Sequence, residues 1–170
     1  MPQLPLRSSG ADPDADVRSA EPNGSSALEL FSTLSRTGLH LDALQRECLS
    51  RHRLAFTEYS VLRLLQRAPD KQLAPSILAD MIVCTTGAMT KLVDRLQRAH
   101  LVERAHDPVD RRRVLVQLTP AGERVADEAS RSYQAGRARV LELLEEQEAE
   151  HIHRSLRRLL DVLETERSNS

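Results

Sequence analysis

The sequence predicts a mainly α-helical protein, with long N- and C-terminal helices around one small β-hairpin. Three observations support this class. Apolar residues recur at helical spacing along most of the chain. Two short β-type runs, separated by a charged turn, occur only after residue 100. Aromatic residues make up 2% of the 170 residues and Trp is absent, so the core must consist mainly of Leu, Val, Ile and Ala.

The N-terminal part divides into a polar segment and a helix. Residues 1–24 are rich in Pro, Ser, Asp, Gly and Ala and have little periodicity, which predicts a disordered arm without a function of its own. Ser26 and Glu29 have the spacing of a capping box, so we expect a helix to begin there. It should continue to about Arg51, weakened or bent at Gly38.

Two shorter helices follow. Thr57 is expected to cap the first, which ends before Pro69. Pro75 takes the first position of the second, which continues to Val83. Ala74 stands where a Ser or Thr cap would be expected, so this helix should begin weakly.

The next helix, from Thr85 to Arg98, has two contrasting faces. Thr85 and Thr86 precede its first apolar turn, where a threonine hydroxyl can accept an orphan N–H. The buried face has apolar residues at i, i+3, i+4 and i+7: Met89, Leu92, Val93 and Leu96. The opposite face and its flanks carry Gly87, Thr90, Lys91, Asp94, Arg95 and Arg98. Small, hydroxyl and cationic side chains suit a helix that enters a DNA major groove, although a solvated surface helix explains the pattern alone equally well.

A β-hairpin with a cationic tip is predicted directly after this helix. A strand around Leu101–Val102 is broken by the Asp107–Asp110 turn, and a second strand covers Val114–Leu118. Three consecutive arginines, Arg111, Arg112 and Arg113, lie between them. A basic hairpin beside a helix-turn-helix is a winged helix, with a β-wing of three strands or fewer.

The tip residues are assigned separate roles. Arg112 is the predicted minor-groove contact, and the Asp110 carboxylate is expected to orient its guanidinium by a charge-assisted hydrogen bond. Arg111 and Arg113 alternate to the other face, so we expect them to contact phosphate.

Thr119-Pro120 repeats the cap-then-Pro signal and begins a long helix. The segment from Ser130 to Arg139 is poor in large apolar residues and contains Gly136, which predicts a bend. A last leucine-rich helix should extend from about residue 146 to residue 164.

Charge is segregated along the chain, although the net charge is only −1. Residues 91–113 hold seven cations and four anions, and residues 142–166 hold three cations and eight anions. The predicted reading head is therefore basic and the far end acidic.

The stretch TTGAMTKLVDRLQRAHLVER followed by DPVDRRRVLVQLTPAG resembles the MarR family of bacterial transcriptional regulators. The family's wing pattern, Asp-x-Arg and then a strand ending in Leu-Thr, is matched by Asp110, Arg112, Leu118 and Thr119. The resemblance covers about residues 28–164. Where the family has Gly at the end of the recognition helix, this chain has His100, a residue type that tolerates the left-handed region.

The resemblance implies a homodimer that binds a palindromic operator in double-stranded DNA, as a repressor released by a small aromatic ligand. Its winged helix-turn-helix would occupy about residues 54–120, with dimerisation helices at about 26–51 and 120–165. An alternative is a DNA-binding or adaptor module that does not regulate transcription and does not respond to a ligand. The expected DNA contacts are Thr85, Thr86, Gly87, Thr90, Lys91, Arg95, Asp110, Arg111, Arg112 and Arg113.

A ligand pocket is implied between the dimerisation helices and the reading head. The chain is also similar to the urate-responsive branch of the family, but of that branch's ligand residues only Arg104 is matched and Trp is absent. We therefore expect a small aromatic carboxylate rather than urate, with His52, Tyr59 and Arg104 as contacts. A role for Arg104 on a phosphate or on a neighbouring strand is at least as well supported.

Other function classes lack a signal. Cys48 and Cys84 form no disulfide framework, and the six histidines have no metal-ligand spacing. Cys84 precedes a helix N-terminus and is the better redox candidate, but a small buried hydrophobe is the favoured interpretation. No nucleotide-binding or hydrolase motif is present, so neither an enzyme nor a cofactor is predicted. Without a signal peptide or a bilayer-length apolar run, a soluble cytoplasmic protein without membrane contact is expected.

Overall fold

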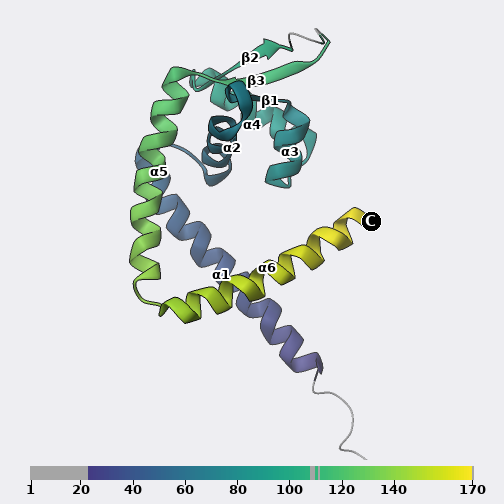
Figure 1. Ribbon diagram of the computed structural model, residues 1–170, viewed down its shortest axis with the longest axis vertical. Coiled ribbons are helices and arrows are strands. Elements are labelled where there is room, and N and C mark those ends of the chain that lie inside the picture. The colour runs from purple at the N-terminus through teal and green to yellow at the C-terminus, as the bar shows by residue number, and fades with distance from the viewer. Residues whose placement is uncertain (1–22, 108–109, 111, 170) are drawn as a thin grey trace, which may run out of the picture. The chain divides into compact units, whose positions relative to one another are not determined.

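A computed structural model describes residues 23–107, 110 and 112–169 (Figure 1). The chain divides into two units, Met1–His40 and Leu41–Ser170, and helix α1 (Asn23–Leu49) crosses the boundary between them. The predicted arm at residues 1–24 lies outside the described residues, except that positions 23 and 24 belong to α1. The predicted cap at Ser26 is wrong, because α1 has already begun at Asn23.

Helix α1 passes through Gly38 without a break, so the predicted bend there is not observed. One glycine lowers helix stability by only about 1 kcal/mol, which a 27-residue helix tolerates. A short 3-10 turn, η1 (Ser50–His52), follows α1.

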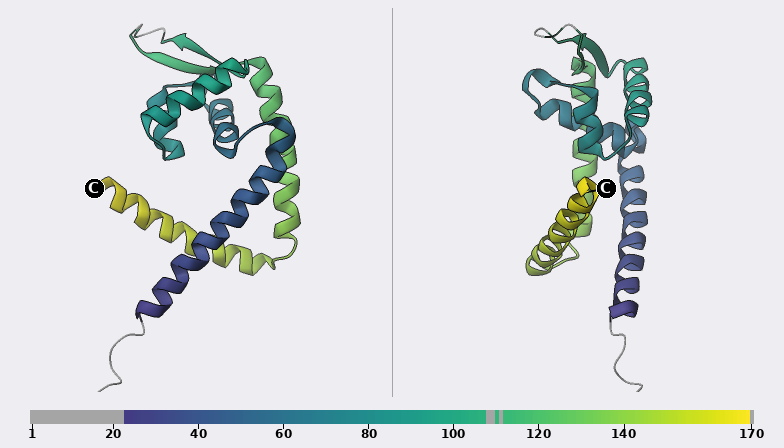
Figure 2. Two further views of the ribbon diagram at one scale, coloured as in Figure 1. Left: turned by 180° about the vertical axis from the view of Figure 1, so that it is seen from behind. Right: turned by 90° about the vertical axis from the view of Figure 1, so that its right-hand side faces the viewer.

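Seven further elements form the compact part that we call the reading head. They are α2 (Phe56–Arg67), η2 (Pro69–Lys71), β1 (Gln72–Leu73), α3 (Pro75–Ile82), α4 (Thr86–Arg98), β2 (Val102–His106) and β3 (Val114–Leu118). The strands form an antiparallel sheet in the order β1-β3-β2. Val102 pairs with Leu118 and His106 pairs with Val114, so β2 and β3 form the predicted hairpin and extend side by side away from α5 (Figures 1 and 2). The predicted fold, mainly α with a winged helix-turn-helix, is confirmed.

The helix starts show which capping predictions hold. Helix α2 begins one residue before Thr57, with Ala55 at the cap position, so the predicted Thr57 cap is wrong. The Glu58 carboxylate instead accepts the Ala55 N–H at 2.8 Å and satisfies this helix end. Helix α3 begins at Pro75 after Ala74, which makes no side-chain cap, as expected.

The core of the reading head is aliphatic, as the composition predicts. Its fully buried members come from the three α-helices of the head and from two strands: Val61, Leu62, Leu65, Leu78, Met89, Val93, Leu96, Val102 and Val116. Leu49 at the end of α1 and Ala126 and Ala129 on α5 complete the same cluster. Burial of each large side chain contributes about 1.5–3 kcal/mol, so this cluster sets the position of α4 in the head.

Two long helices end the chain. Helix α5 (Pro120–Leu141) begins as predicted, with the Thr119 hydroxyl accepting the Gly122 N–H at 2.9 Å. The predicted bend in α5 is wrong: the helix is continuous through Gly136, which is buried where Cys48 of α1 approaches. Helix α6 (Glu146–Asn169) is longer at its C-terminal end than expected.

No single helix in the described part of the chain is long and apolar enough to cross a membrane. Among the helices that the structure describes, α3 and α4 taken together meet the length and composition for a span, but they meet at a bend of 109°.

Candidate nucleic-acid interface

A tight turn between α3 and α4 sets the direction of the second helix. Val83 ends α3 in the left-handed region, at φ 59°, and the Cys84 N–H donates to the Ala79 carbonyl at 3.0 Å. Thr85 then caps α4 as predicted, because its hydroxyl accepts the Ala88 N–H at 3.2 Å. The turn and the cap together give a helix-turn-helix.

The two predicted faces of α4 are both present. Met89, Leu92, Val93 and Leu96 are buried in the head. The first two turns expose Thr86, Gly87, Thr90 and Lys91. The exposed surface is therefore small and polar at the N-terminal end of the helix, where the helix dipole is positive.

Two residues of this exposed face have features that matter for close approach. A Cβ placed on Gly87 would meet nothing within 4 Å, so the surface there is open backbone. The Thr90 hydroxyl donates to the Thr86 carbonyl at 2.9 Å, which leaves its oxygen lone pairs and its methyl group facing outward. Gly87 therefore permits close contact, and Thr90 offers an acceptor and an apolar group.

The tip of the β2–β3 hairpin is folded by backbone contacts. The Asp107 N–H donates to the Arg113 carbonyl at 3.1 Å, and the Arg113 N–H donates to the Asp110 carbonyl at 2.8 Å. The side chains of Arg112 and Arg113 are exposed. Arg111 lies outside the described residues. The described part of the hairpin tip thus presents two exposed cations.

Asp110 acts on the backbone rather than on a guanidinium. Its Oδ1 accepts the backbone N–H of Arg112 at 3.0 Å, and its own N–H donates to the Asp107 carboxylate at 3.3 Å. The predicted hydrogen bond from the Arg112 guanidinium to Asp110 is not present among the described residues. An aspartate two residues before an arginine reaches the arginine's backbone N–H more readily than its guanidinium, because the backbone N–H is nearer. The carboxylate therefore closes a tight turn.

Two predicted site residues hold α4 in place. The Nε of Arg95 forms an ion pair with the Glu58 carboxylate of α2, at an N···O distance of 3.1 Å. Arg104 of β2 donates to Asp94 at 2.7 Å and to Gln97 at 2.6 Å. In this structure Arg104, a candidate ligand contact, therefore connects the wing to α4.

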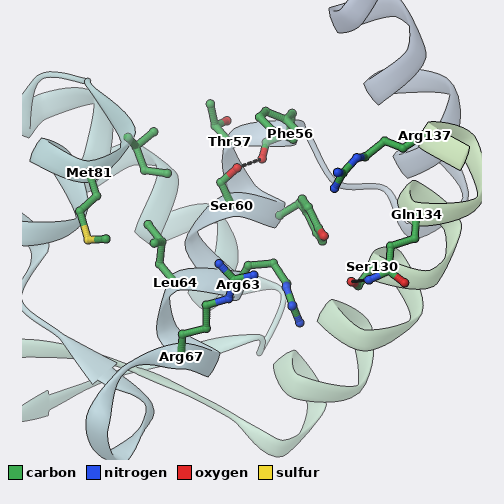
Figure 3. Close-up of a pocket in the computed structure, with 12 residues that line it drawn as sticks. Phe56, Thr57, Ser60, Arg63, Leu64, Arg67, Met81, Ser130, Gln134 and Arg137 are labelled. Atoms are coloured by element: carbon green, nitrogen blue, oxygen red, sulfur yellow. Dashed lines mark hydrogen bonds between the residues drawn. The ribbon is translucent and has the colours of Figure 1, made fainter. Parts of the chain in front are cut away.

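Of the three predicted ligand contacts, only Tyr59 lines the cavity that lies between α2, α3 and α5. This cavity has a volume of about 460 Å³ (Figure 3). His52 instead makes a hydrogen bond with Ser132 at 3.0 Å, and Arg104 contacts α4. The prediction placed these three residues around one ligand, with only Arg104 taken from the family pattern, whereas the structure gives them separate surroundings.

The cavity has two chemical features that the sequence analysis missed. Its lining includes three arginines, Arg63 and Arg67 from α2 and Arg137 from α5. The i, i+4 spacing of the first two was a visible signal that both lie on one helix face. Two aromatic rings of the lining, Phe56 and Tyr59, pack with the Tyr133 ring of α5, and the three centroids lie 5.6–6.1 Å apart.

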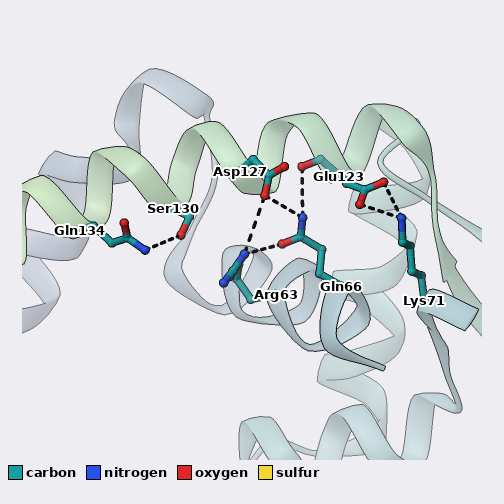
Figure 4. A network of polar contacts seen from close by, with 7 residues as sticks. All are labelled: Arg63, Gln66, Lys71, Glu123, Asp127, Ser130 and Gln134. Atoms are coloured by element: carbon teal, nitrogen blue, oxygen red, sulfur yellow. Dashed lines mark hydrogen bonds and ion pairs between the residues drawn. The ribbon is translucent and has the colours of Figure 1, made fainter. Parts of the chain in front are cut away.

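A polar network connects the cavity wall to α5 (Figure 4). Arg63 donates to Gln66 at 2.6 Å, and Gln66 donates to Asp127 of α5 at 3.0 Å. Lys71 forms an ion pair with Glu123, also of α5, at 2.7 Å. Arg63 therefore belongs both to the cavity lining and to the contacts between α2 and α5. No cluster of metal-ligating side chains occurs in the part of the chain that the structure describes.

A helix-turn-helix with an exposed polar helix face, beside a β-hairpin with a cationic tip, defines a winged-helix DNA-binding protein. The MarR family model matches residues 54–114. The chain is 32% identical to the uncharacterised HTH-type transcriptional regulator YsmB of Bacillus subtilis over 108 residues, which are 61% of this chain and 73% of that protein. It is 29% identical to the HTH-type transcriptional regulator MhqR of the same species over 133 residues, 78% of this chain and 90% of that protein. The chain belongs to the MarR family.

The solved structures agree with this assignment. A mutant of MarR from E. coli, crystallised with operator DNA, superposes with a TM-score of 0.73 at 25% identity, covering 80% of this chain and 96% of that one. The predicted family is thus confirmed, and the chain is a DNA-binding transcriptional regulator rather than an enzyme.

Proposed function

We propose that this chain is a repressor that binds a palindromic operator as a homodimer. The observation that carries the proposal is the small, polar face at the start of α4 beside the cationic wing. A helix of this kind suits the major groove, and a wing of this kind suits phosphate or the minor groove. The operator DNA bound by E. coli MarR supports this docking by analogy.

Every predicted DNA contact except Arg95 has a place in the proposal. Thr86, Gly87, Thr90 and Lys91 face base edges, and Thr85 presents the N-terminus of α4 to phosphate. Arg112 enters the minor groove and Arg113 contacts phosphate. Asp110 shapes the turn that leads into these two residues. Arg111, outside the described residues, keeps its proposed phosphate contact.

Dimerisation is proposed through α1, α5 and α6, close to the predicted segments 26–51 and 120–165, with residues 54–120 as the DNA-binding region. The support is a set of exposed apolar side chains on these helices: Leu28, Phe31, Leu39, Leu141, Ile152, Leu156, Leu160 and Leu163. So many exposed apolar residues are typical of an interface. A two-fold axis would place the two α4 helices about 34 Å apart, one turn of DNA.

Light scattering tests the assembly directly. We expect about twice the chain mass of 19.1 kDa, and Leu156→Glu together with Leu160→Glu should give the single chain mass. A parent protein that is monomeric at micromolar concentration would contradict the proposal.

As a transcriptional regulator, the protein would act in the cytoplasm, where the DNA of a bacterial cell lies.

Release by a small aromatic carboxylate is proposed at the cavity between α2, α3 and α5. Its aromatic side chains suit a ring, and its three arginines suit a carboxylate. Tyr59 stays a proposed contact, whereas Arg104 and His52 have structural partners in this structure. Salicylate is a suitable probe: millimolar salicylate should weaken DNA binding by the parent and have less effect on Arg137→Ala.

Selection from a random-sequence DNA library tests the function against its alternative. We expect the parent protein to enrich an inverted repeat with half-sites one helical turn apart. Enrichment of no sequence, together with strongly salt-dependent binding to any duplex, would instead favour a non-regulatory DNA-binding or adaptor module.

A further inference from the structure

An ion pair with an almost entirely buried carboxylate connects α4 to α2. The Glu58 side chain is 11% exposed, and its Oε1 lies 3.1 Å from Nε of Arg95. Its Oε2 accepts the N–H of Ala55 at 2.8 Å, which satisfies the start of α2. Both oxygens therefore have fixed partners, and the carboxylate cannot turn away from Arg95 without leaving that N–H unsatisfied.

The residue before Arg95 forms a second ion pair, in a different direction. Asp94 accepts from Arg104 of β2 at 2.7 Å, and Arg104 also donates to Gln97 at 2.6 Å. Consecutive helix residues point about 100° apart, so the two pairs connect α4 to two different elements. The apolar contacts beneath α4 are not directional, whereas the hydrogen bonds of Arg104 are, and the Arg95–Glu58 ion pair holds α4 to one point on α2. Together the two pairs restrain the rotation of α4 about its own axis.

We propose that Arg95 is a positioning residue, which fixes the rotation of the recognition helix through Glu58, and that it is not a phosphate contact. The inference rests on the proposed contact of α4 with base edges. A side chain about 5–6 Å from the helix axis moves by roughly 1 Å when the helix rotates by about 10°. Such a shift disrupts the hydrogen bonds of Thr90 and Lys91 to bases, but hardly changes the attraction between the protein and phosphates.

The pattern of exposed charge on α4 assigned Arg95 to DNA because it lies beside Lys91. The structure gives its guanidinium a partner on the opposite side, in the head itself. A phosphate contact and a positioning role make different predictions: the first affects all DNA sequences equally and changes the salt dependence, whereas the second affects only the preferred sequence.

Two substitutions test the pair with little change elsewhere. Glu58→Gln keeps an oxygen that can accept the Ala55 N–H and removes only the charge. Arg95→Met keeps an unbranched side chain on a half-exposed position. The probes are the duplex that the parent enriches from a random library and a scrambled duplex of equal length. Arg98→Met, one exposed arginine further along the same helix, is the matched control.

Each variant of the pair should bind the enriched duplex roughly 5- to 30-fold more weakly, and the double variant no more weakly than the weaker single variant. Binding to the scrambled duplex should change by less than about twofold, and the slope of log K against log salt should stay that of the parent. Arg98→Met should leave the sequence preference unchanged.

Two results would overturn the inference. One is a shallower salt slope for Arg95→Met on both duplexes while Glu58→Gln binds like the parent, which would make Arg95 a phosphate contact. The other is an additive loss in the double variant. If the parent enriches no sequence, the proposed function fails, but the salt slopes of the two variants on the scrambled duplex still decide whether Arg95 contacts phosphate. Binding is measured at least 20 °C below the midpoint of thermal unfolding of each variant, so that a loss of stability is not mistaken for a loss of positioning.

Discussion

Gly136 of α5 lies directly against the thiol of Cys48 in α1, and no room is left for a side chain between them. A Cβ on residue 136 would overlap the Cys48 Sγ, while Leu44 lies next to the same spot. We therefore predict that Gly136→Ala lowers the free energy of unfolding by up to about 2 kcal/mol, because overpacking costs about 1–3 kcal/mol and the gain in helix propensity offsets only about 1 kcal/mol of it. Adding Cys48→Ala, which removes the overlapping sulfur, should restore most of the loss. Denaturant unfolding of the two variants measures both effects.

Gly87→Ala is the matched control, since a Cβ there meets nothing within 4 Å. This variant should be as stable as the parent or slightly more stable. It should nevertheless bind the enriched duplex more weakly, because the new methyl group stands on the face proposed to approach the bases. Equal destabilisation by both glycine substitutions would show that the close approach to Cys48 has no special role.

Thr90→Ala and Lys91→Ala are expected to change which operator bases are preferred. Both side chains are exposed on the first turns of α4, where they are proposed to meet base edges. Each good base contact gives about 1–3 kcal/mol of discrimination, so the relative affinities for single-base variants of the operator should change by about fivefold or more. Affinities for a set of such variants provide the measurement. A uniform loss on every sequence would instead assign these side chains to the DNA backbone.

Oxidation is predicted not to regulate binding. Cys48 is buried against Gly136, and Cys84 is half-buried at the turn before α4. Restricted access slows attack by peroxide on both thiols. Operator affinity should therefore be the same before and after treatment with millimolar peroxide. A loss of affinity that Cys84→Ser prevents would show that this cysteine is a sensor.

The types and order of the elements in the reading head were predictable, because they depend on local signals. Pro75 at a helix start, the apolar spacing on α4 and the Thr119-Pro120 cap each act within a few residues. Errors arose where a distant contact decides. Gly136 suggested a bend by its sequence context, but its lack of a side chain serves contact with α1, some 90 residues away in the chain. Thr57 was a plausible cap, yet Glu58 satisfies the helix start one residue earlier.

The candidate site was predictable to a similar extent. The polar face of α4 could be predicted because burial follows helical periodicity. The cavity could not, because its lining comes from α2, α3 and α5, which only tertiary packing brings together. The ion-pair partners of Arg95 and Arg104 could not be predicted either. An arginine side chain can reach several neighbours, and the sequence does not say which carboxylate tertiary packing brings near it.

Substitutions of Arg112 and Asp110 in the wing should weaken DNA binding to different degrees. Arg112→Ala removes an exposed cation from each subunit, so affinity should fall by roughly 2–6 kcal/mol per dimer if each contact contributes about 1–3 kcal/mol. The slope of log K against log salt should also become shallower, since fewer counterions are released. Asp110→Ala should cause a smaller loss, because its carboxylate only closes the turn through the Arg112 backbone N–H. Arg131→Ala, which removes an exposed arginine of α5, is the matched control and should leave affinity unchanged. These affinities are measured on the enriched duplex at two salt concentrations. If Arg112→Ala binds like the parent at both, the wing does not contact DNA, and the proposed roles of Asp110 and Arg113 lose their basis.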